Sequence, residues 1–152
     1  MSTSLSEICD LFLTKVNDYR LTTIYNTSGS LATSTYIEPW VLASIVEFSV
    51  CNQDLSYTPT TATEDGYFAE DLTLENKEML ATITTKYWLK KVVQDILQMN
   101  NAVTDHDFRM FSQAQNLKEK REYYNSVCEE VSQMITRYEY KYNDWTTWKN
   151  TL

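Results

Sequence analysis

The stretch "AQNLKEKREYYNSVCEEVSQMITRY", residues 114–138, decides the fold, because its inward positions are spaced for a long helix lying along another helix. These positions are separated alternately by three and four residues, the heptad spacing of helices packed side by side. We call them the seam: Ala114, Leu117, Arg121, Tyr124, Cys128, Val131, Ile135 and Tyr138. Arg121 either pairs with an acidic residue across the helix interface or marks where the seam meets another subunit. A seam of this length predicts a partner helix.

The segment before this stretch supplies the predicted partner, a helix over residues 73–99. Thr73 is a suitable N-cap, and Glu75 lies in the first turn, where a carboxylate is favoured. Apolar residues then recur at helical spacing: Leu80, Ile83, Tyr87, Leu89, Val92, Val93, Ile96 and Leu97. The polar connector "NNAVTDHD", residues 100–107, is short, so we expect this helix and the final helix, which begins within residues 107–118, to be antiparallel neighbours.

The first half of the chain predicts two further helices. Ser4 and Glu7 form a capping box before an apolar face, which predicts a helix at residues 4–20. Pro39 suits the first turn of a second helix that reaches about residue 54. The residues expected to bury that second helix are Val41, Leu42, Ile45, Val46 and Phe48.

Two segments of this half are not predicted to be helical. Residues 21–36 place β-branched and aromatic residues on either side of an Asn-Thr-Ser-Gly-Ser turn. This pattern predicts either a small β-hairpin or an ordered Thr-rich loop. Residues 55–71 contain Pro59 and Gly66 and little periodicity, so we expect a long exposed loop there.

The C-terminal segment changes period. "YEYKY", residues 138–142, alternates aromatic and polar residues, which is strand spacing, and Trp145 and Trp148 follow. These aromatics either fold back as core or form an arm that docks on a neighbouring subunit, adding a strand or filling pockets. The change of period favours the arm. The predicted fold is therefore all-α, a bundle of about four helices in residues 1–137 with an extended aromatic arm at 138–152.

Charge and composition exclude several classes of function. The net charge of −8 disfavours a grip on nucleic acid, which needs clustered Lys and Arg, but an acidic surface would let DNA pass without sticking. Two glycines in 152 residues are too few for a phosphate-cradling loop or a dinucleotide fingerprint. No apolar run approaches the ~20 residues of a membrane span, and "MSTSLSEICD" does not resemble a secretory signal.

Candidate catalytic and metal-binding residues are few. Cys9, Cys51 and Cys128 are odd in number and widely spaced, which favours a reducing compartment over a disulfide framework or a zinc site. All three fall on apolar or semi-apolar helical faces, where a thiol is usually inert. His106 is expected in a polar turn. We therefore expect no metal, no cofactor and no enzymatic activity.

The second half of the chain resembles a group of small tailed-bacteriophage proteins of the head–tail connector, or neck. The resemblance rests on residue types in a fixed order, from an aromatic and an acidic-leucine pair to a Trp-Leu pair, then Asp-Phe-basic and aromatic-Ser-x-Ala. The matching residues are Phe68, Asp71, Leu72, Glu75, Glu78, Leu80, Ala81, Trp88, Leu89, Asp107, Phe108, Arg109, Phe111, Ser112, Gln113, Ala114, Leu117 and Lys118. Members tend to end in a basic tail, whereas this chain ends in Tyr and Trp.

The resemblance implies a helical adaptor that forms a homo-oligomeric ring of twelve copies beneath the portal protein, at the head–tail junction of the virion. It would be made in the bacterial host cytoplasm, join the portal to the next neck or tail protein, and let genomic DNA through without specific binding. We expect Phe108 and Phe111 to anchor the turn against the preceding helix. The expected subunit and portal interface is Phe108, Phe111, Gln113, Asn116, Tyr138, Tyr140, Tyr142, Trp145 and Trp148.

Two other functions remain open from the sequence. An acidic helical assembly chaperone or regulator, absent from the finished particle, would suit the size, acidity and exposed seam equally well. A cysteine-dependent enzyme is the third alternative, with Cys9, Cys51 and Cys128 as the nucleophiles to test.

Overall fold

The computed structural model describes residues 2–16, 18–102 and 107–143, and for residues 99–102 and 107–114 it describes the backbone alone. The chain is mostly helical with a small three-stranded antiparallel sheet, which confirms the predicted fold class. In chain order the elements are β1 (Thr3–Ser4), α1 (Leu5–Lys15), α2 (Tyr19–Glu47), β2 (Tyr57–Thr58), β3 (Tyr67–Phe68), α3 (Leu74–Ala102) and α4 (Asp107–Tyr142).

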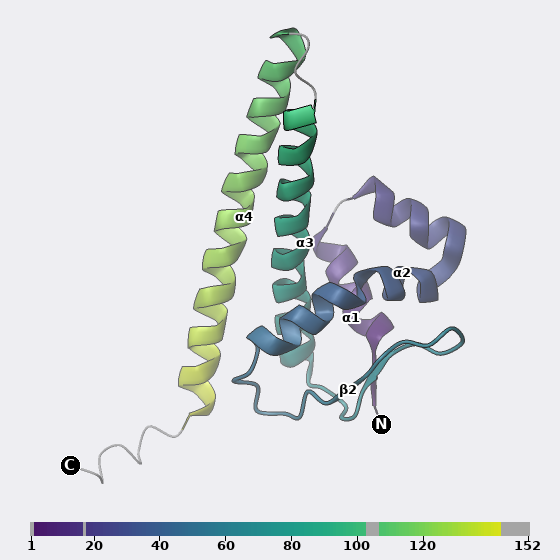
Figure 1. The fold of residues 1–152 in the computed structure, drawn as a ribbon. Coiled ribbons are helices and arrows are strands. Elements are labelled where there is room, and N and C mark those ends of the chain that lie inside the picture. The colour runs from purple at the N-terminus through teal and green to yellow at the C-terminus, as the bar shows by residue number, and fades with distance from the viewer. Residues whose placement is uncertain (1, 17, 103–106, 144–152) are drawn as a thin grey trace, which may run out of the picture.

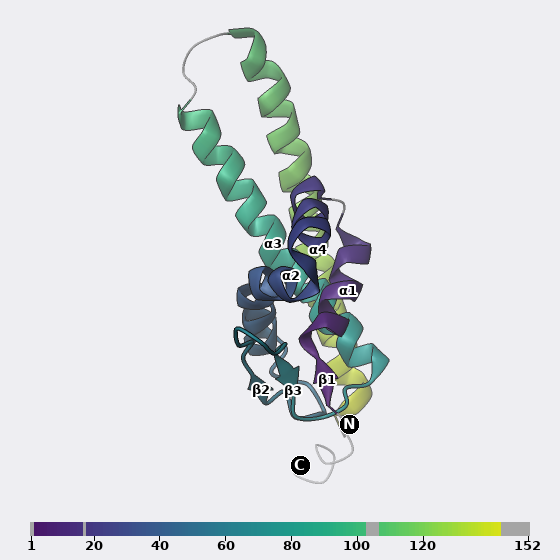
Figure 2. The same ribbon diagram turned by 90° about the vertical axis from the view of Figure 1, so that its right-hand side faces the viewer.

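Helices α3 and α4 form a long antiparallel hairpin that rises beyond the rest of the molecule (Figures 1 and 2). The predicted Thr73 cap is confirmed, because its hydroxyl accepts a hydrogen bond from the Asn76 N–H at 3.3 Å. The seam is also present, but at one position Val127 takes the buried place expected for Cys128. The most buried face of α4 is made by Val127, Val131 and Tyr138, with Tyr124, Met134 and Ile135 partly buried. Arg121 is exposed.

Helix α1 buries one apolar face in the core, against α3 and α2. The predicted capping box is confirmed, with the Glu7 carboxylate accepting from the Ser4 N–H at 3.2 Å. Phe12 is fully buried and meets Trp88 of α3 edge to face, with ring centroids 6.1 Å apart. The helix ends at Lys15 rather than residue 20, because Val16 is extended and Asp18 caps a new helix.

Helix α2 overturns the prediction for residues 21–36, which are helical and form neither a hairpin nor a loop. Gly29, with φ 82° and ψ −179°, breaks α2 into two helical halves. The second half ends at Glu47 rather than 54, and Pro39 lies inside it. Its burial is also narrower than expected, because Leu42 is 41% and Val46 78% exposed.

The sheet lies in the segment predicted to be a long exposed loop. Strand β3 is central, and Phe68 pairs with Thr3 of β1 on one side and Tyr57 of β2 on the other. Gly66 is required between β2 and β3, because a Cβ there would lie 2.0 Å from the Tyr57 hydroxyl oxygen. The rest of residues 55–71 is a largely exposed loop as expected, and the two strands escape prediction because strands of two residues leave no periodic pattern.

The strand spacing read at residues 138–142 is also wrong, because α4 continues to Tyr142. Tyr138 is core rather than arm: it is 3% exposed, and its ring lies 4.9 Å from Phe48. The burial of Tyr138 against the end of α2 keeps this segment helical. The rest of the predicted arm, with Trp145 and Trp148, lies outside the described residues.

Candidate interaction surface

A partly buried polar network fastens the C-terminal end of α4 to the body. The Tyr138 hydroxyl accepts from the Asn52 N–H at 3.0 Å and also bonds the Asn52 side chain. The Asn76 side-chain amide, on the first turn of α3, donates to Asn52 at 3.1 Å and to Gln53 at 2.7 Å. Gln53 in turn accepts from the Thr73 N–H at 2.8 Å. The network therefore joins α4, the segment after α2 and the start of α3.

Aromatic and charged side chains continue this contact toward the surface. The Tyr138 and Tyr142 rings lie 4.5 Å apart, and the Tyr142 hydroxyl donates to Glu75 at 2.7 Å. Lys141 also bonds Glu75, at 2.8 Å, and these two donors lower the pKa of that carboxyl. Burial raises the pKa of Tyr138 to about 12, so its phenol is neutral at physiological pH. This end of the hairpin is thus rigidly built.

The same end of the molecule is acidic. Residues 50–78 carry seven carboxylates and one cation, Lys77. Some of these groups are used internally: Lys77 pairs with Glu7 at 2.7 Å, and Asp65 accepts from the Ser6 N–H at 2.8 Å. Most of the carboxylate-bearing residues are exposed, so this end presents a negative field to any partner.

The structure divides the predicted interface residues between two ends of α4. Tyr140 and Tyr142 are 64% and 41% exposed at the C-terminal end, beside the buried Tyr138. Asn116 is exposed near the other end, about 36 Å from Tyr140 at 1.5 Å per residue. The backbone of Phe108, Phe111 and Gln113 lies in the first turns of α4. Their side chains, like Trp145 and Trp148, lie outside the described residues.

Sequence reasoning missed three residues that hold this end together, namely Asn52, Gln53 and Asn76. It correctly places Phe48 in the core, but not its contact with Tyr138, which lies 90 residues later in the chain. The three side-chain amides lie among other polar residues in the sequence, and their spacing matches no known motif. The only signal was that Asn76 occupies the first turn after a Thr cap, where its side chain can reach back to a loop.

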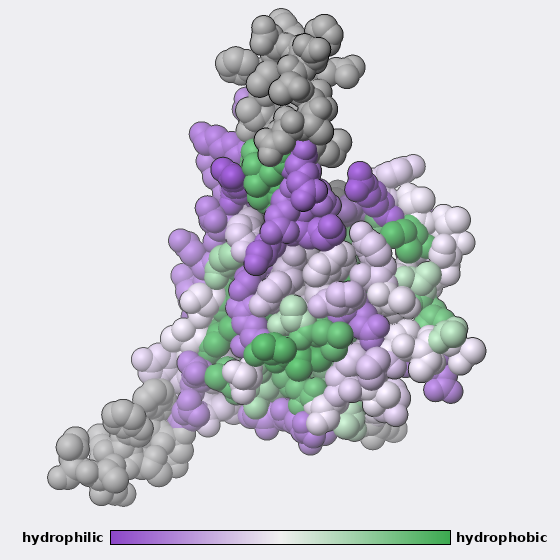
Figure 3. All heavy atoms as spheres, in the orientation of Figure 1, coloured by the Kyte–Doolittle hydropathy of each residue, from purple (hydrophilic) through white to green (hydrophobic). Residues whose placement is uncertain are grey.

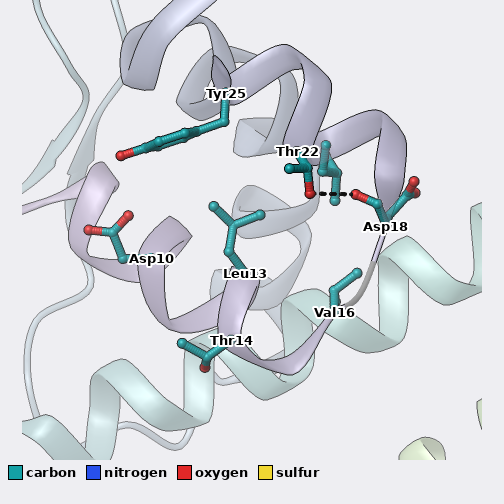
Figure 4. Close-up of a pocket in the computed structure, with 8 residues that line it drawn as sticks. Asp10, Leu13, Thr14, Val16, Asp18, Thr22 and Tyr25 are labelled. Carbon is teal, nitrogen blue, oxygen red and sulfur yellow. Dashed lines mark hydrogen bonds between the residues drawn. The ribbon is translucent and has the colours of Figure 1, made fainter.

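A hollow of about 280 Å³ separates α1 from the first half of α2 (Figure 4). Leu13 and Val16 form its apolar side, and Tyr25 and Asp10 stand at its rim. The Thr22 hydroxyl turns away to its own helix and donates to the Asp18 carbonyl at 3.1 Å. A second apolar area lies over the second half of α2 (Figure 3), where Leu42 and Val46 are exposed.

Of the three thiols, that of Cys9 is buried and those of Cys51 and Cys128 are partly buried. Burial raises the pKa of Cys9 to about 12, so its thiol is protonated at neutral pH. Burial also raises the pKa of Cys51. His106 lies outside the described residues. Within the described ranges there is no group of three or more His, Cys, Asp or Glu residues placed to hold a metal ion.

No helix in the described part of the chain is long and apolar enough to cross a membrane. Comparison with known proteins adds no relative: no protein-family model, no curated protein and no solved structure matches this chain.

Proposed function

We propose that this protein is a structural subunit of a bacteriophage head–tail connector ring. The observation that carries the proposal is where the connector-like residues fall. The middle of that pattern, from Glu75 to Leu89, lies on α3, and its last part, residues 107–118, opens α4, whereas its first three residues precede α3. Most of the pattern thus lies on one antiparallel hairpin, the dominant element of the fold.

The shape of the molecule supports assembly by side-to-side contact. The hairpin stands beyond the body (Figure 1), and both of its ends carry exposed polar or aromatic side chains. Twelve identical subunits would make heterologous contacts that close into a ring. The acidic surface would let genomic DNA slide through the channel without specific binding.

The two ends of α4 would contact different components. Tyr140 and Tyr142, followed by Trp145 and Trp148, would meet the portal protein or a neighbouring subunit. Asn116, with Phe108, Phe111 and Gln113, would meet a neighbour or the next neck or tail protein. The chain would be made in the host cytoplasm, reside at the head–tail junction of the virion, and perform no catalysis.

The copy number of this chain in purified particles tests the proposal. Quantitative mass spectrometry, referenced to the major shell protein, is expected to find about a dozen copies. Hundreds of copies would instead indicate a shell or tube component. We expect Tyr140→Ala to reduce incorporation of the chain into particles. Tyr67 lies in the sheet and is 43% exposed, so Tyr67→Ala serves as the control and should leave incorporation unchanged.

The second candidate, an assembly chaperone, is favoured by one observation. Leu42 and Val46 leave an apolar strip on α2 that is uncovered in the isolated subunit. A chaperone would bind a partner through such a strip and then leave. Complete absence of the chain from finished particles would overturn the connector proposal and support this alternative.

A further inference from the structure

The first half of α2, residues 19–28, is held to the body by very little. Leu21 is buried and Ile24 partly buried, while the other eight residues of this half are exposed, Tyr19 by 85%. We call residues 19–28 the hinged segment. The burial of one side chain and part of another is small compared with α3, whose residues 79–85 are all buried.

The composition of the hinged segment does not favour a helix. Its second half reads "IYNTSG" to Gly29, and Thr22 and Thr23 precede it. Thr, Asn and Ser are weak helix formers, and an isolated helix of ten residues is marginal in water. The threonines turn their hydroxyls back on the helix: Thr23 and Thr27 donate to the carbonyls four residues earlier, at 2.8 and 2.6 Å. Within the described residues, neither hydroxyl bonds another element.

Non-helical backbone bounds the segment on both sides. At its end, Gly29 has φ 82° and ψ −179°, a region open essentially to glycine alone. A Cβ at Gly29 would meet nothing within 4 Å, so the backbone conformation, and not crowding, requires glycine. At its start, Val16 and Asp18 are extended, with φ of −121° and −120°. The segment can therefore unfold by itself without disrupting the helical turns on either side.

The surface beneath the segment is poorly filled. One side is the 280 Å³ hollow over Leu13 and Val16 of α1. On the other side, a hollow of about 270 Å³ separates Tyr19 and Arg20 from Trp88 and Val92 of α3. Unfilled apolar space forfeits dispersion contacts. The closed position of the segment is thus only weakly stabilised.

We propose that the hinged segment is a lid that opens by unfolding locally as one unit, as far as Gly29, while the rest of the fold stays intact. Opening uncovers the apolar side of α1 at Leu13 and Val16 and the Trp88 face of α3. Beyond Gly29 the motion stops, because Thr33, Ser34 and Ile37 are buried in the body. The inference concerns the isolated chain and stands whether or not it builds a connector.

Hydrogen exchange of the full-length chain, read peptide by peptide, tests the lid. Amides of residues 23–28 are expected to exchange at least about 100-fold faster than those of residues 80–89, because local opening needs less free energy than global unfolding. Equal protection of the two regions would overturn the proposal.

Three variants separate local opening from general instability. The triple change Thr22→Ala, Thr23→Ala and Thr27→Ala raises helix propensity and is expected to slow exchange in residues 23–28 about 20-fold. Gly29→Ala strains the closed joint and is expected to speed exchange there about tenfold. Exchange in residues 80–89 should change in neither variant.

Thr136→Ala is the matched control, because Thr136 is exposed on α4 and its hydroxyl also donates to the carbonyl four residues earlier, at 2.8 Å. It should leave exchange in the hinged segment unaltered. If the triple variant changes residues 23–28 and 80–89 by the same factor, opening is global and there is no lid.

Discussion

The two halves of the α3–α4 hairpin share the same two helices but differ in what covers them. The base, residues 74–93 and 124–142, packs on α1, α2 and the loops, and includes fully buried Leu80, Ile83 and Leu89. In the outer half, residues 94–102 and 107–123, none of the described side chains is buried. The alternating spacing runs through both halves. Spacing therefore selects the partner helix, whereas burial requires a third layer.

Polar contacts show the same difference. In the base, Lys86 and Glu47 form an ion pair whose side chains are 19% and 23% exposed. In the outer half, Lys118 and Glu122 lie 3.9 Å apart with side chains 77% and 67% exposed. The first pair is shielded from water and the second is not, so only the first should affect stability strongly.

The largest expected effect comes from truncating the apolar core of each half. Leu89→Ala, at a fully buried site of the base, should lower the free energy of unfolding by about 3 kcal/mol, because a cavity remains. Leu117→Ala, at a half-buried site of the outer half, should lower it by about 1 kcal/mol. Urea denaturation measures both. Equal losses would mean that the two halves are equally packed.

Removing one partner of each ion pair should give an intermediate effect. Lys86→Met leaves the Glu47 carboxylate half-buried without its cation, which should lower the free energy of unfolding by about 2 kcal/mol. Lys118→Met should change it by less than about 0.5 kcal/mol. Raising the salt concentration should only slightly reduce the difference between the free-energy losses of the two variants, because partly buried pairs are weakly screened. An equal loss of unfolding free energy in both variants would contradict the distinction between a shielded and an exposed ion pair.

The smallest effect is expected from single hydroxyl groups. Tyr138→Phe removes the acceptor of the Asn52 N–H and should lower the free energy of unfolding by about 1 kcal/mol. Tyr123 is 46% exposed in the outer half, so Tyr123→Phe should change the free energy of unfolding by less than about 0.5 kcal/mol.

Alkaline pH gives a second test of the Tyr138 hydroxyl. The folded-state pKa of Tyr138 is raised to about 12, above its ordinary value of 10.0. Its contribution is therefore complete below pH 10 and is lost as the pH rises through 12. Unfolding curves at pH 10 and pH 12 should show a smaller decline for Tyr138→Phe than for the unsubstituted chain. The pKa of Tyr124 is also raised to about 12, so ionisation of Tyr124 will cause part of the loss of stability between pH 10 and pH 12 in both proteins.

Local signals in the sequence predicted those elements whose ends and faces are encoded nearby. The Ser4–Glu7 capping box and the Thr73 cap begin helices where expected, and the seam correctly paired α3 with α4. Each of these signals lies within a few turns of the structure it predicts, so no distant contact was needed to read it.

The errors arose where distant contacts outweigh local preference. Residues 21–36 look extended, yet burial of Leu21, Thr33 and Ser34 draws them into a helix, with Gly29 taking up the break. Leu42 and Val46 follow an apolar period but face outward, because Val41 and Ser44 take the inward positions. For the candidate site, the exposed tyrosines were readable in the sequence, but the Asn52–Asn76 network was not.

The tie between the N-terminus and residues 70–72 has a consequence for synthesis of the chain. The Thr3 N–H donates to the Glu70 carbonyl at 3.1 Å, and its hydroxyl accepts from the Leu72 N–H at 2.8 Å. The ribosome releases Thr3 several seconds before these partners, at about 5–20 residues per second. During that interval α1 presents Leu5, Ile8 and Phe12 to water without the cover of α3. A chain interrupted before residue 72 would therefore leave the ribosome as an aggregation-prone fragment.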